Sequence, residues 1–314
     1  MPPAKGRHDQ SIRATSNTPR CPCQSWIADV LTAVDRLVVG VVDVAQAVET
    51  YRNLGFTVTH GGGAEDGSHQ TAYAVFGDFS MEFRDTEASP PVFEAATSGR
   101  EPGEAEGIHG IVFRSDNLDA EIARLKSSGF HVSDPVDDPT DGGGGSMSRR
   151  SVAVDSPIPV GVVEHHHAAA ERSAFVGDAT THPNTATVLE RIYLAVESID
   201  RGLERFEQLL GVPAPEPEMG TVIMSLMSVF YVGDVGIAVA EPRGDGPTAS
   251  ALSANGPGLF QVLFRAEHLD RAAALMVENG VPPPTRGTRL SGESALLVEP
   301  AHACNLFVAL AGPP

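Results

Sequence analysis

The sequence is poor in cysteine, in basic residues and in long apolar runs, and each shortage argues against a class of protein. Three cysteines among 314 residues make a disulfide framework implausible, so a reducing, cytoplasmic location is predicted. Only 22 Lys and Arg residues stand against 41 Asp and Glu, and the formal charge of -19 would repel a nucleic-acid backbone. No apolar stretch approaches the roughly 20 residues that span a bilayer, so no membrane partner is expected.

The remaining composition is that of a globular protein with room for two domains. Hydrophobic residues make up 41% of the chain and the mean hydropathy is -0.07, values that fit a soluble protein. Residues 1–32 are different, because they lack both hydrophobic periodicity and the continuous apolar segment of a secretory signal. We therefore predict a disordered leader in front of the folded part.

One pattern of strand, helix and turn occurs four times along the chain. The two strongest copies are VDRLVVGVVDVAQAVETYRNLGF at 34–56 and LERIYLAVESIDRGLERFEQLLGV at 189–212. Weaker copies begin at Ile108 and Leu259, and the hairpin VFGDFSMEF of the first unit matches YVGDVGIAV of the third. Each unit is predicted to be a strand, a helix and three strands, which makes the fold class α+β.

The four units are expected to pair, because the sheet of a single unit would leave one face without a partner. The first and second would form a domain at 33–167, and the third and fourth a domain at 188–314, joined by a linker at 168–187. A second linker, rich in Gly, Asp, Pro, Ser and Asn, is predicted between the third and fourth units. A monomer and a homodimer both remain open.

Two tandem units per domain, with the phrases VDRLVVGVVDVAQAVETYRNLGF and GDFSMEF, resemble the vicinal oxygen chelate superfamily over about residues 33–312. Glyoxalase I, extradiol dioxygenases and the fosfomycin and bleomycin resistance proteins belong to it. The resemblance implies that each pair of units curls into a cup, an incomplete barrel. It also implies a divalent metal in the cup, held by His or Gln from the first strand and Glu from the last strand of a unit.

The resemblance can be carried over position by position. In the N-terminal half the positions fall on Arg36 and Glu82, and then on Gly110, with His109 one residue earlier, and Glu164. In the C-terminal half they fall on Arg191, Ala238, Gln261 and Val308. Carboxylates are therefore expected only in the N-terminal cup, which is predicted to be the site of any chemistry.

The resemblance thus implies that Glu82, Glu164, His109 and His166 hold Zn, Fe, Mn or Ni, with His69 as a further candidate. Glu82 or Glu164 would then act as the catalytic proton shuttle. A plainer interpretation is also open. Arginine cannot ligate a metal, so Arg36 would form an ion pair with Glu82 and no metal would bind.

Two of the histidines carry their own alternatives. His109 needs a β-bulge to enter the cup, because a one-residue shift along a strand turns a side chain to the other face. On an extended strand His166 shares a face with Glu164, but it also fits a solvated strand end.

The residues expected to contact substrate are Arg36, Arg191 and Gln261. At Arg191 the expected carboxylate is replaced by Ala238, and a buried unpaired charge is costly. Either another acid, Glu190 or Glu197, pairs with Arg191, or a small anionic ligand binds it in the C-terminal cup. Two functions follow: a metal-dependent lyase, isomerase or dioxygenase that works in the N-terminal cup, or a metal-free protein that sequesters a metabolite or drug.

Overall fold

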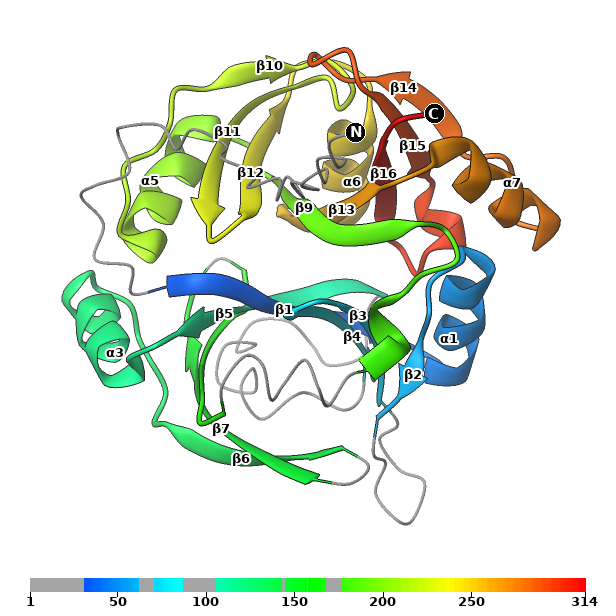
Figure 1. Ribbon diagram of the computed structural model, residues 1–314. Helices are drawn as coiled ribbons and strands as arrows, with labels where there is room; N and C mark the ends of the chain where they lie inside the picture. Colours follow the sequence, from blue (N-terminus) through cyan, green and yellow to red (C-terminus); the bar gives the residue numbers. More distant parts are fainter. Residues whose placement is uncertain (1–30, 62–70, 87–105, 143–144, 157, 168–176) are drawn as a thin grey trace, which may run out of the picture.

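A computed structural model describes residues 31–61, 71–86, 106–142, 145–156, 158–167 and 177–314. The predicted leader at 1–32 falls almost wholly outside these residues, as does His69. Within them, no helix is long and apolar enough to cross a membrane. The described chain forms two eight-stranded mixed sheets with flanking helices (Figure 1).

The N-terminal sheet has the strand order β2-β3-β4-β1-β5-β8-β7-β6. Its first unit comprises β1 (Leu31–Val41), α1 (Val44–Asn53), β2 (Thr59–His60), β3 (Thr71–Phe76) and β4 (Phe79–Asp85). Its second unit comprises β5 (Gly107–Ser115), α3 (Leu118–Ser127), β6 (Val136–Gly142), β7 (Gly145–Val154) and β8 (Val160–His165). A short 3-10 helix, η1 (Gly177–Thr180), precedes the second sheet.

The C-terminal sheet repeats that order as β10-β11-β12-β9-β13-β16-β15-β14. The third unit comprises β9 (Ala186–Ala195), α5 (Ile199–Leu210), β10 (Glu218–Gly220), β11 (Ser225–Val232) and β12 (Val235–Pro242). After α6 (Pro247–Asn255), the fourth comprises β13 (Gly258–Ala266), α7 (Leu269–Glu278), β14 (Thr285–Thr288), β15 (Ser294–Val298), η2 (Pro300–His302) and β16 (Phe307–Gly312).

The pairing within the sheets confirms the predicted α+β fold of four units. In each unit the first strand runs parallel to the last, as β1 does to β4 and β9 to β12. Neighbouring units meet through their antiparallel first strands, β1 with β5 and β9 with β13. Each sheet ends in short edge strands that do not pair with one another, so each forms an incomplete barrel. We call the concave sides the N-terminal cup and the C-terminal cup.

The helices begin and end where their sequences predict. The Asp43 carboxylate accepts hydrogen bonds from the backbone N–H groups of Ala45 and Gln46, which caps α1. The buried residues Val44, Ala47, Val48 and Tyr51 recur at helical spacing and face the sheet. Gly55 then ends the helix at φ +82°, a conformation that glycine adopts without strain.

The two sheets lie back to back, with their concave sides turned away from one another (Figure 1). A continuous apolar core fills the space between them. Phe264 of the C-terminal sheet stacks on Phe76 of the N-terminal sheet, with ring centres 4.3 Å apart, and contacts Phe56 at 5.6 Å. Burial of such rings supplies most of the stability of the interface.

Helices from the two halves also contact one another across the core. Arg124 of α3 donates to the backbone carbonyls of Gln208 and Leu209 at the end of α5, where it caps the helix. On the other side, the Asn279 amide donates to the Asn53 carbonyl, next to α1. The two halves are therefore held together by polar contacts at both ends of the apolar core.

The segment predicted as a linker between the third and fourth units is instead partly helical, as α6 (Pro247–Asn255). Proline is tolerated at the first turn of a helix, where its missing N–H has no partner to lose. Gly256, at φ +71°, ends the helix. The signals were a Pro at one end and a Gly at the other, with an alanine-rich segment between them.

Candidate functional site

A β-bulge at the same place in each unit's first strand shapes both cups. Asp35 in β1, His109 in β5, Glu190 in β9 and Phe260 in β13 have no partner residue in the neighbouring first strand. A bulge inserts one residue without a partner, so it changes which side chains reach a given face. The bulge predicted at His109 is therefore present, and the His109 ring lies so close to Gly40 of β1 that a Cβ at Gly40 would clash with it.

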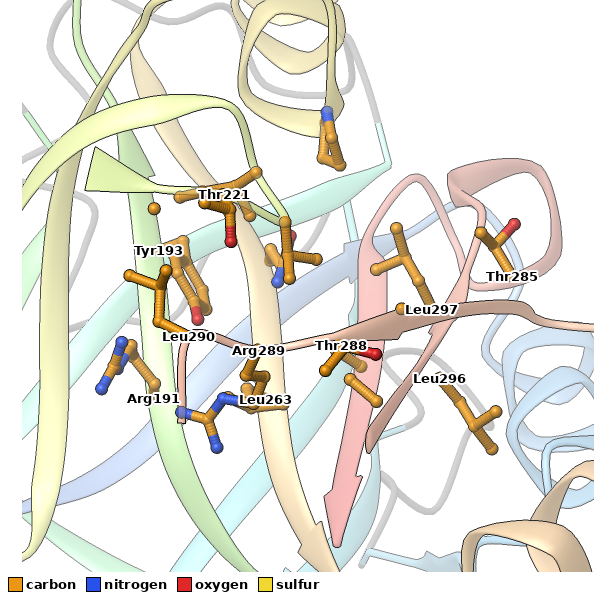
Figure 2. Close-up of a pocket in the computed structure, with 18 of the residues that line it drawn as sticks. Arg191, Tyr193, Thr221, Leu263, Thr285, Thr288, Arg289, Leu290, Leu296 and Leu297 are labelled. Atoms are coloured by element: carbon orange, nitrogen blue, oxygen red, sulfur yellow. The ribbon is translucent and has the colours of Figure 1, made fainter. Parts of the chain in front are cut away.

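A pocket of about 640 Å³ lies in the C-terminal cup. Strands β9 and β13 supply Arg191, Tyr193 and Gln261, and the segment from β14 towards β15 supplies Arg289 and Leu290. Figure 2 shows Arg191, Arg289 and the Tyr193 hydroxyl at one end of the pocket, and Leu297 at the other. The pocket therefore has a polar end and an apolar end.

Most of the charged side chains at the polar end of the pocket form ion pairs with one another. Arg289 donates to both carboxylate oxygens of Glu190 and also contacts Glu293, 2.8 Å away. Glu190 accepts from Arg265 as well, and although burial raises its pKa, the hydrogen bonds and charges of these arginines hold it below its ordinary value. Glu190 is thus occupied by two other arginines and does not form an ion pair with its neighbour Arg191.

Arg191 is left without a carboxylate partner among the residues that the structure describes. Its Nε is buried and makes no hydrogen bond, and its guanidinium carbon lies 5.9 Å from the centre of the Tyr193 ring. Burial raises the pKa of Tyr193, so its hydroxyl stays protonated at neutral pH. The structure therefore brings two of the predicted substrate contacts, Arg191 and Gln261, to one pocket.

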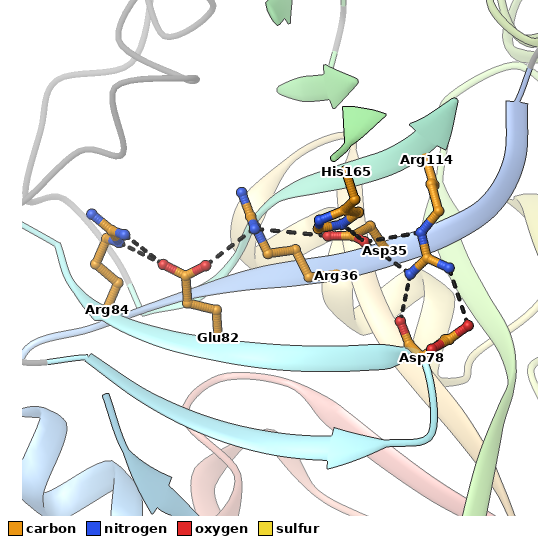
Figure 3. Close-up of polar contacts among 7 residues, drawn as sticks. All are labelled: Asp35, Arg36, Asp78, Glu82, Arg84, Arg114 and His165. Atoms are coloured by element: carbon orange, nitrogen blue, oxygen red, sulfur yellow. Dashed lines mark hydrogen bonds and ion pairs between the residues drawn. The ribbon is translucent and has the colours of Figure 1, made fainter. Parts of the chain in front are cut away.

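The N-terminal cup holds a chain of alternating charges instead (Figure 3). Arg84 donates to Oε1 of Glu82 from two nitrogens, at 2.6 and 2.9 Å. Arg36 Nε lies 3.2 Å from Oε2 of the same carboxylate, an ion pair without hydrogen-bond alignment. Glu82 is only 1% exposed, and although burial raises its pKa, the charges of Arg36 and Arg84 hold it below its ordinary value. The ion pair expected between Arg36 and Glu82 is therefore present.

The chain of charges continues through Asp35. Arg36 Nη1 lies 3.7 Å from one oxygen of Asp35, and His165 Nε2 lies 2.6 Å from the other. Arg114 also contacts that second oxygen, at 2.9 Å, and reaches Asp78 at 3.3 Å. Burial raises the pKa of Asp35, but the contacts with His165, Arg36 and Arg114 together hold it well below the ordinary range. Each of the carboxylates Glu82, Asp35 and Asp78 in the N-terminal cup therefore already has a cationic neighbour.

Glu164 does not share the cup with Glu82, so the prediction of two carboxylates in one hollow is wrong. Glu82 pairs with Val38 of β1. Val112, the residue of β5 that corresponds to Val38, pairs with Gly161, and Glu164 lies three residues further along the chain. An odd offset puts a side chain on the opposite face. There the Glu164 carboxylate accepts from the backbone N–H of Leu118, 2.9 Å away, at the start of α3.

The third unit confirms that this is a helix-capping position. Its Glu241 accepts from the backbone N–H of Ile199 at the start of α5, 2.8 Å away. The same register corrects the fourth unit, where Ala309, opposite Leu263, takes the place that was assigned to Val308. Ala238 was placed correctly, opposite Tyr193.

His166 is exposed and lies 3.2 Å from the Ser148 hydroxyl, so it does not enter the cup. Its neighbour His165 does enter the cup, because the residues of β8 that face the cup are shifted by one position from those predicted. His165 and Asp35 were both missed as cup residues. The available signal was that an acid precedes the equivalent arginine in two units, as Asp35-Arg36 and Glu190-Arg191.

The donor groups that the structure describes do not fit a resident divalent metal in either cup. Among the residues that the structure describes, no three His, Cys, Asp or Glu side chains gather as a metal-binding group. In the N-terminal cup both oxygens of Glu82 face arginines. In the C-terminal cup the four equivalent positions are Arg191, Ala238, Gln261 and Ala309, which offer a single amide oxygen.

A family model described as a glyoxalase-like domain matches residues 34–210, more than half of the chain. No curated protein matches the chain in sequence. Among solved structures, the chain is similar to a xylose isomerase-like TIM barrel/4-hydroxyphenylpyruvate dioxygenase fusion protein, with 15% identity and a TM-score of 0.59. That match covers 91% of this chain and 49% of the other, so this chain spans about half the length of the fusion protein.

Two further structures are similar over nearly their whole length. A mutant of 4-hydroxymandelate synthase from Streptomyces coelicolor has 14% identity and a TM-score of 0.62, with 90% of this chain and 92% of the other covered. A hypothetical protein from Staphylococcus aureus has 9% identity and a TM-score of 0.58, with 89% and 99% covered. At these identities the likeness establishes a shared fold.

Proposed function

The chain belongs to the glyoxalase-like domain family, within the vicinal oxygen chelate superfamily, and on that premise we propose that it binds a small organic anion in its C-terminal cup without a resident metal ion. The observation that carries this proposal is Arg191, whose buried Nε has no partner among the described residues and whose side chain lines the pocket. Arg191 interacts with the neutral Tyr193 hydroxyl and with the charge of nearby Glu190. It forms no ion pair with a carboxylate among the described residues, and a bound anion would supply that partner.

The pocket supports binding of an organic molecule rather than a bare ion. Its volume of about 640 Å³ lies within the range of roughly 300–1,000 Å³ typical of small-molecule sites. The other two arginines of its lining are already compensated, Arg289 by Glu190 and Glu293, and Arg286 by Asp270. Arg191 is therefore the guanidinium best suited to hold a carboxylate, which it can bind with two parallel hydrogen bonds.

Calorimetric titration with octanoate in the presence of EDTA tests the proposal. We expect wild-type protein to bind octanoate, and Arg191→Ala to weaken binding by about 10- to 100-fold, the worth of a charge-assisted hydrogen bond. Arg201→Ala is the matched control, because the Arg201 side chain is 77% exposed on α5 and lies outside the pocket lining. Equal affinity in wild type and Arg191→Ala, or binding that requires an added metal, would overturn the proposal.

A metal-dependent lyase, isomerase or dioxygenase is the rival function. The names of two similar structures, a dioxygenase fusion protein and 4-hydroxymandelate synthase, favour an enzyme. The ion pairs around Glu82 argue against the metal that the superfamily resemblance implies. Metal analysis of folded protein purified without an affinity tag separates the two. A stoichiometric divalent metal that is lost in Glu82→Gln supports the enzyme, and its absence supports the binding protein.

A further inference from the structure

A second polar group in the C-terminal pocket lacks a partner, and it has the opposite hydrogen-bonding character to Arg191. Gln261 is only 3% exposed, it lines the pocket, and its Oε1 is buried without a hydrogen bond in the described part of the chain. A buried amide oxygen without a donor is unfavourable. The pocket therefore offers a cation and an acceptor, which a simple carboxylate cannot satisfy together.

The two groups are close enough for one small head group to reach both. Gln261 pairs with Tyr193 and Leu263 pairs with Arg191 across the antiparallel strands β9 and β13. Arg191 and Gln261 are therefore diagonal neighbours, and such neighbours lie about 7–8 Å apart. Both residues line the same pocket, so one small head group bound there has both within its reach.

Apolar side chains also line the pocket away from Arg191, among polar ones such as Thr285 and Thr288. Leu263 and Leu297 belong to the apolar cluster of the cup, and Leu297 lies at the end away from Arg191 (Figure 2). Leu296, the neighbour of Leu297 on β15, faces the core between the sheets instead. Val222 and Leu290 also line the pocket and are 37% and 65% exposed; Leu290 lies beside Arg191 and Tyr193 (Figure 2). An apolar chain that leaves the polar end of the pocket would cover these side chains and remove their area from water.

We propose that the ligand of this cup is an amphipathic organic acid with a hydrogen-bond donor, a hydroxyl or N–H group, on the carbon next to its carboxylate. This inference rests on the proposed anion-binding function of the same pocket. The carboxylate binds Arg191, the donor binds Gln261 Oε1, and an apolar chain lies along the leucines. A 2-hydroxy fatty acid of medium length has all three features, and 2-hydroxyoctanoate is the probe of choice.

Four related probes separate these contacts in calorimetric titrations. Each enantiomer of 2-hydroxyoctanoate is compared with octanoate, which lacks the donor, and with 2-methoxyoctanoate, which keeps the oxygen but cannot donate. The uncharged 2-hydroxyoctanamide completes the set. We expect one hydroxy acid enantiomer to bind about tenfold more tightly than octanoate and 2-methoxyoctanoate, since a buried acceptor is then satisfied. The amide should bind at least tenfold more weakly than that acid.

Variants of Gln261 identify the residue that makes this distinction. In Gln261→Leu, which keeps the approximate size but has no acceptor, the preference for hydroxy acid over octanoate should fall to about onefold, while octanoate still binds. Gln261→Glu keeps an acceptor but adds a negative charge, so it should weaken every acid. Leu297→Ala should remove apolar contact from that end of the pocket. The affinity for both acids should fall alike, by about fourfold for each methylene group that the ligand no longer buries.

The outcomes distinguish the two proposals. If acids bind in an Arg191-dependent way but wild type shows no preference for the hydroxy acid, the ligand class is wrong and the anion-binding function stands. A preference that persists unchanged in Gln261→Leu also overturns the ligand class. If no acid binds wild-type protein, the proposed function itself fails, and the inference fails with it.

Discussion

Arg36 and Arg191 occupy the same position in the two sheets, but among the described residues only Arg36 forms an ion pair with a carboxylate. Arg36 Nε lies 3.2 Å from Glu82 across the parallel strands β1 and β4. At the corresponding place beside Arg191, strand β12 carries Ala238. The same scaffold thus gives one cup whose charges are satisfied internally and another whose guanidinium is available to a ligand.

The first prediction concerns the stability that Glu82 contributes to the N-terminal cup. Glu82→Gln would leave Arg36 and Arg84 facing a neutral amide in a site where Glu82 is 1% exposed. Breaking a buried ion pair by removing one partner costs about 3–5 kcal/mol. Urea unfolding should therefore show a loss of that size in the free energy of unfolding.

Glu49→Gln is the control for that measurement, because Glu49 is exposed on α1. An exposed substitution should stay within about 0.5 kcal/mol of wild type. Equal losses in the two variants would mean that the charge chain of the N-terminal cup contributes nothing specific to stability.

The second prediction is a loss of stability in acid. Asp35 and Glu82 both have pKa values held below their ordinary values of 3.8 and 4.5, so the folded chain binds fewer protons than the unfolded chain near those values. Their contribution is complete above about pH 5.5 and declines as the pH falls through the ordinary pKa values. The unfolding free energy of the wild type should therefore fall between pH 4.5 and pH 3.5.

Asp35→Asn tests the origin of that decline. The variant should be less stable at pH 7, because Arg114 and His165 lose a shared anionic partner. Its further loss between pH 4.5 and 3.5 should be smaller than that of wild type. Asp155→Asn, at an exposed position, should keep the wild-type decline. An unchanged decline in Asp35→Asn would assign the acid sensitivity to other groups.

The fold could be predicted from the sequence because the pattern recurs over whole elements, and a long repeat tolerates errors at single positions. The equivalence of Arg36 and Arg191, and the absence of a carboxylate at Ala238, came from the same repeat and agree with the strand registers. Gln261 was also placed correctly, and it lines the pocket.

The position of Glu164 could not be predicted, because it depends on how β8 pairs with β5 and not on the local sequence. The residue opposite Val112 is Gly161, whose lack of a side chain gives no sequence signal. The prediction therefore used the nearest carboxylate, Glu164, which lies three residues further along the chain. The bulges added a second difficulty, since they decide which of two successive residues reaches a cup. Asp35 was not predicted as a cup residue because it lies at such a bulge.

The third prediction concerns the contact between α3 and α5. Arg124 forms two hydrogen bonds with the fully buried Glu121 and also caps α5. Arg124→Ala should therefore cost about 3 kcal/mol of unfolding free energy, because a buried carboxylate loses its partner. The double variant Glu121→Gln with Arg124→Ala should recover part of that loss. Lys126→Ala, exposed on the same helix, should have little effect, and a loss as large as that of Arg124→Ala would contradict the assignment.

The fourth prediction concerns His182, which joins the segment before β9 to the N-terminal sheet. Its Nδ1 accepts from the Thr57 N–H and its Nε2 donates to the Val75 carbonyl, both at 3.0 Å. His182→Leu leaves both backbone groups without a partner, so a loss of about 2–4 kcal/mol is expected. His131→Leu, at an exposed position, is the control.

The same residue should add a pH dependence near neutrality. Burial lowers the pKa of His182 below its ordinary 6.5, so the unfolded chain binds more protons as the pH falls past that value. Wild-type stability should fall between pH 7 and 5.5, and this fall should be smaller in His182→Leu. An identical fall in both proteins would show that His182 does not titrate with unfolding.

The last prediction transfers the charge pair of one cup to the other. Ala238→Glu places a carboxylate opposite Tyr193, as Glu82 stands opposite Val38, and so supplies Arg191 with an internal partner. The bound anion and the new carboxylate would compete for one guanidinium, so octanoate affinity should fall by at least tenfold. Ala238→Gln adds nearly the same volume to this fully buried position without the charge, and should weaken binding less. Calorimetric titration of both variants, with thermal unfolding to confirm that each is folded, makes the comparison. Equal affinities in the two variants would show that the free charge of Arg191 is not what holds the anion.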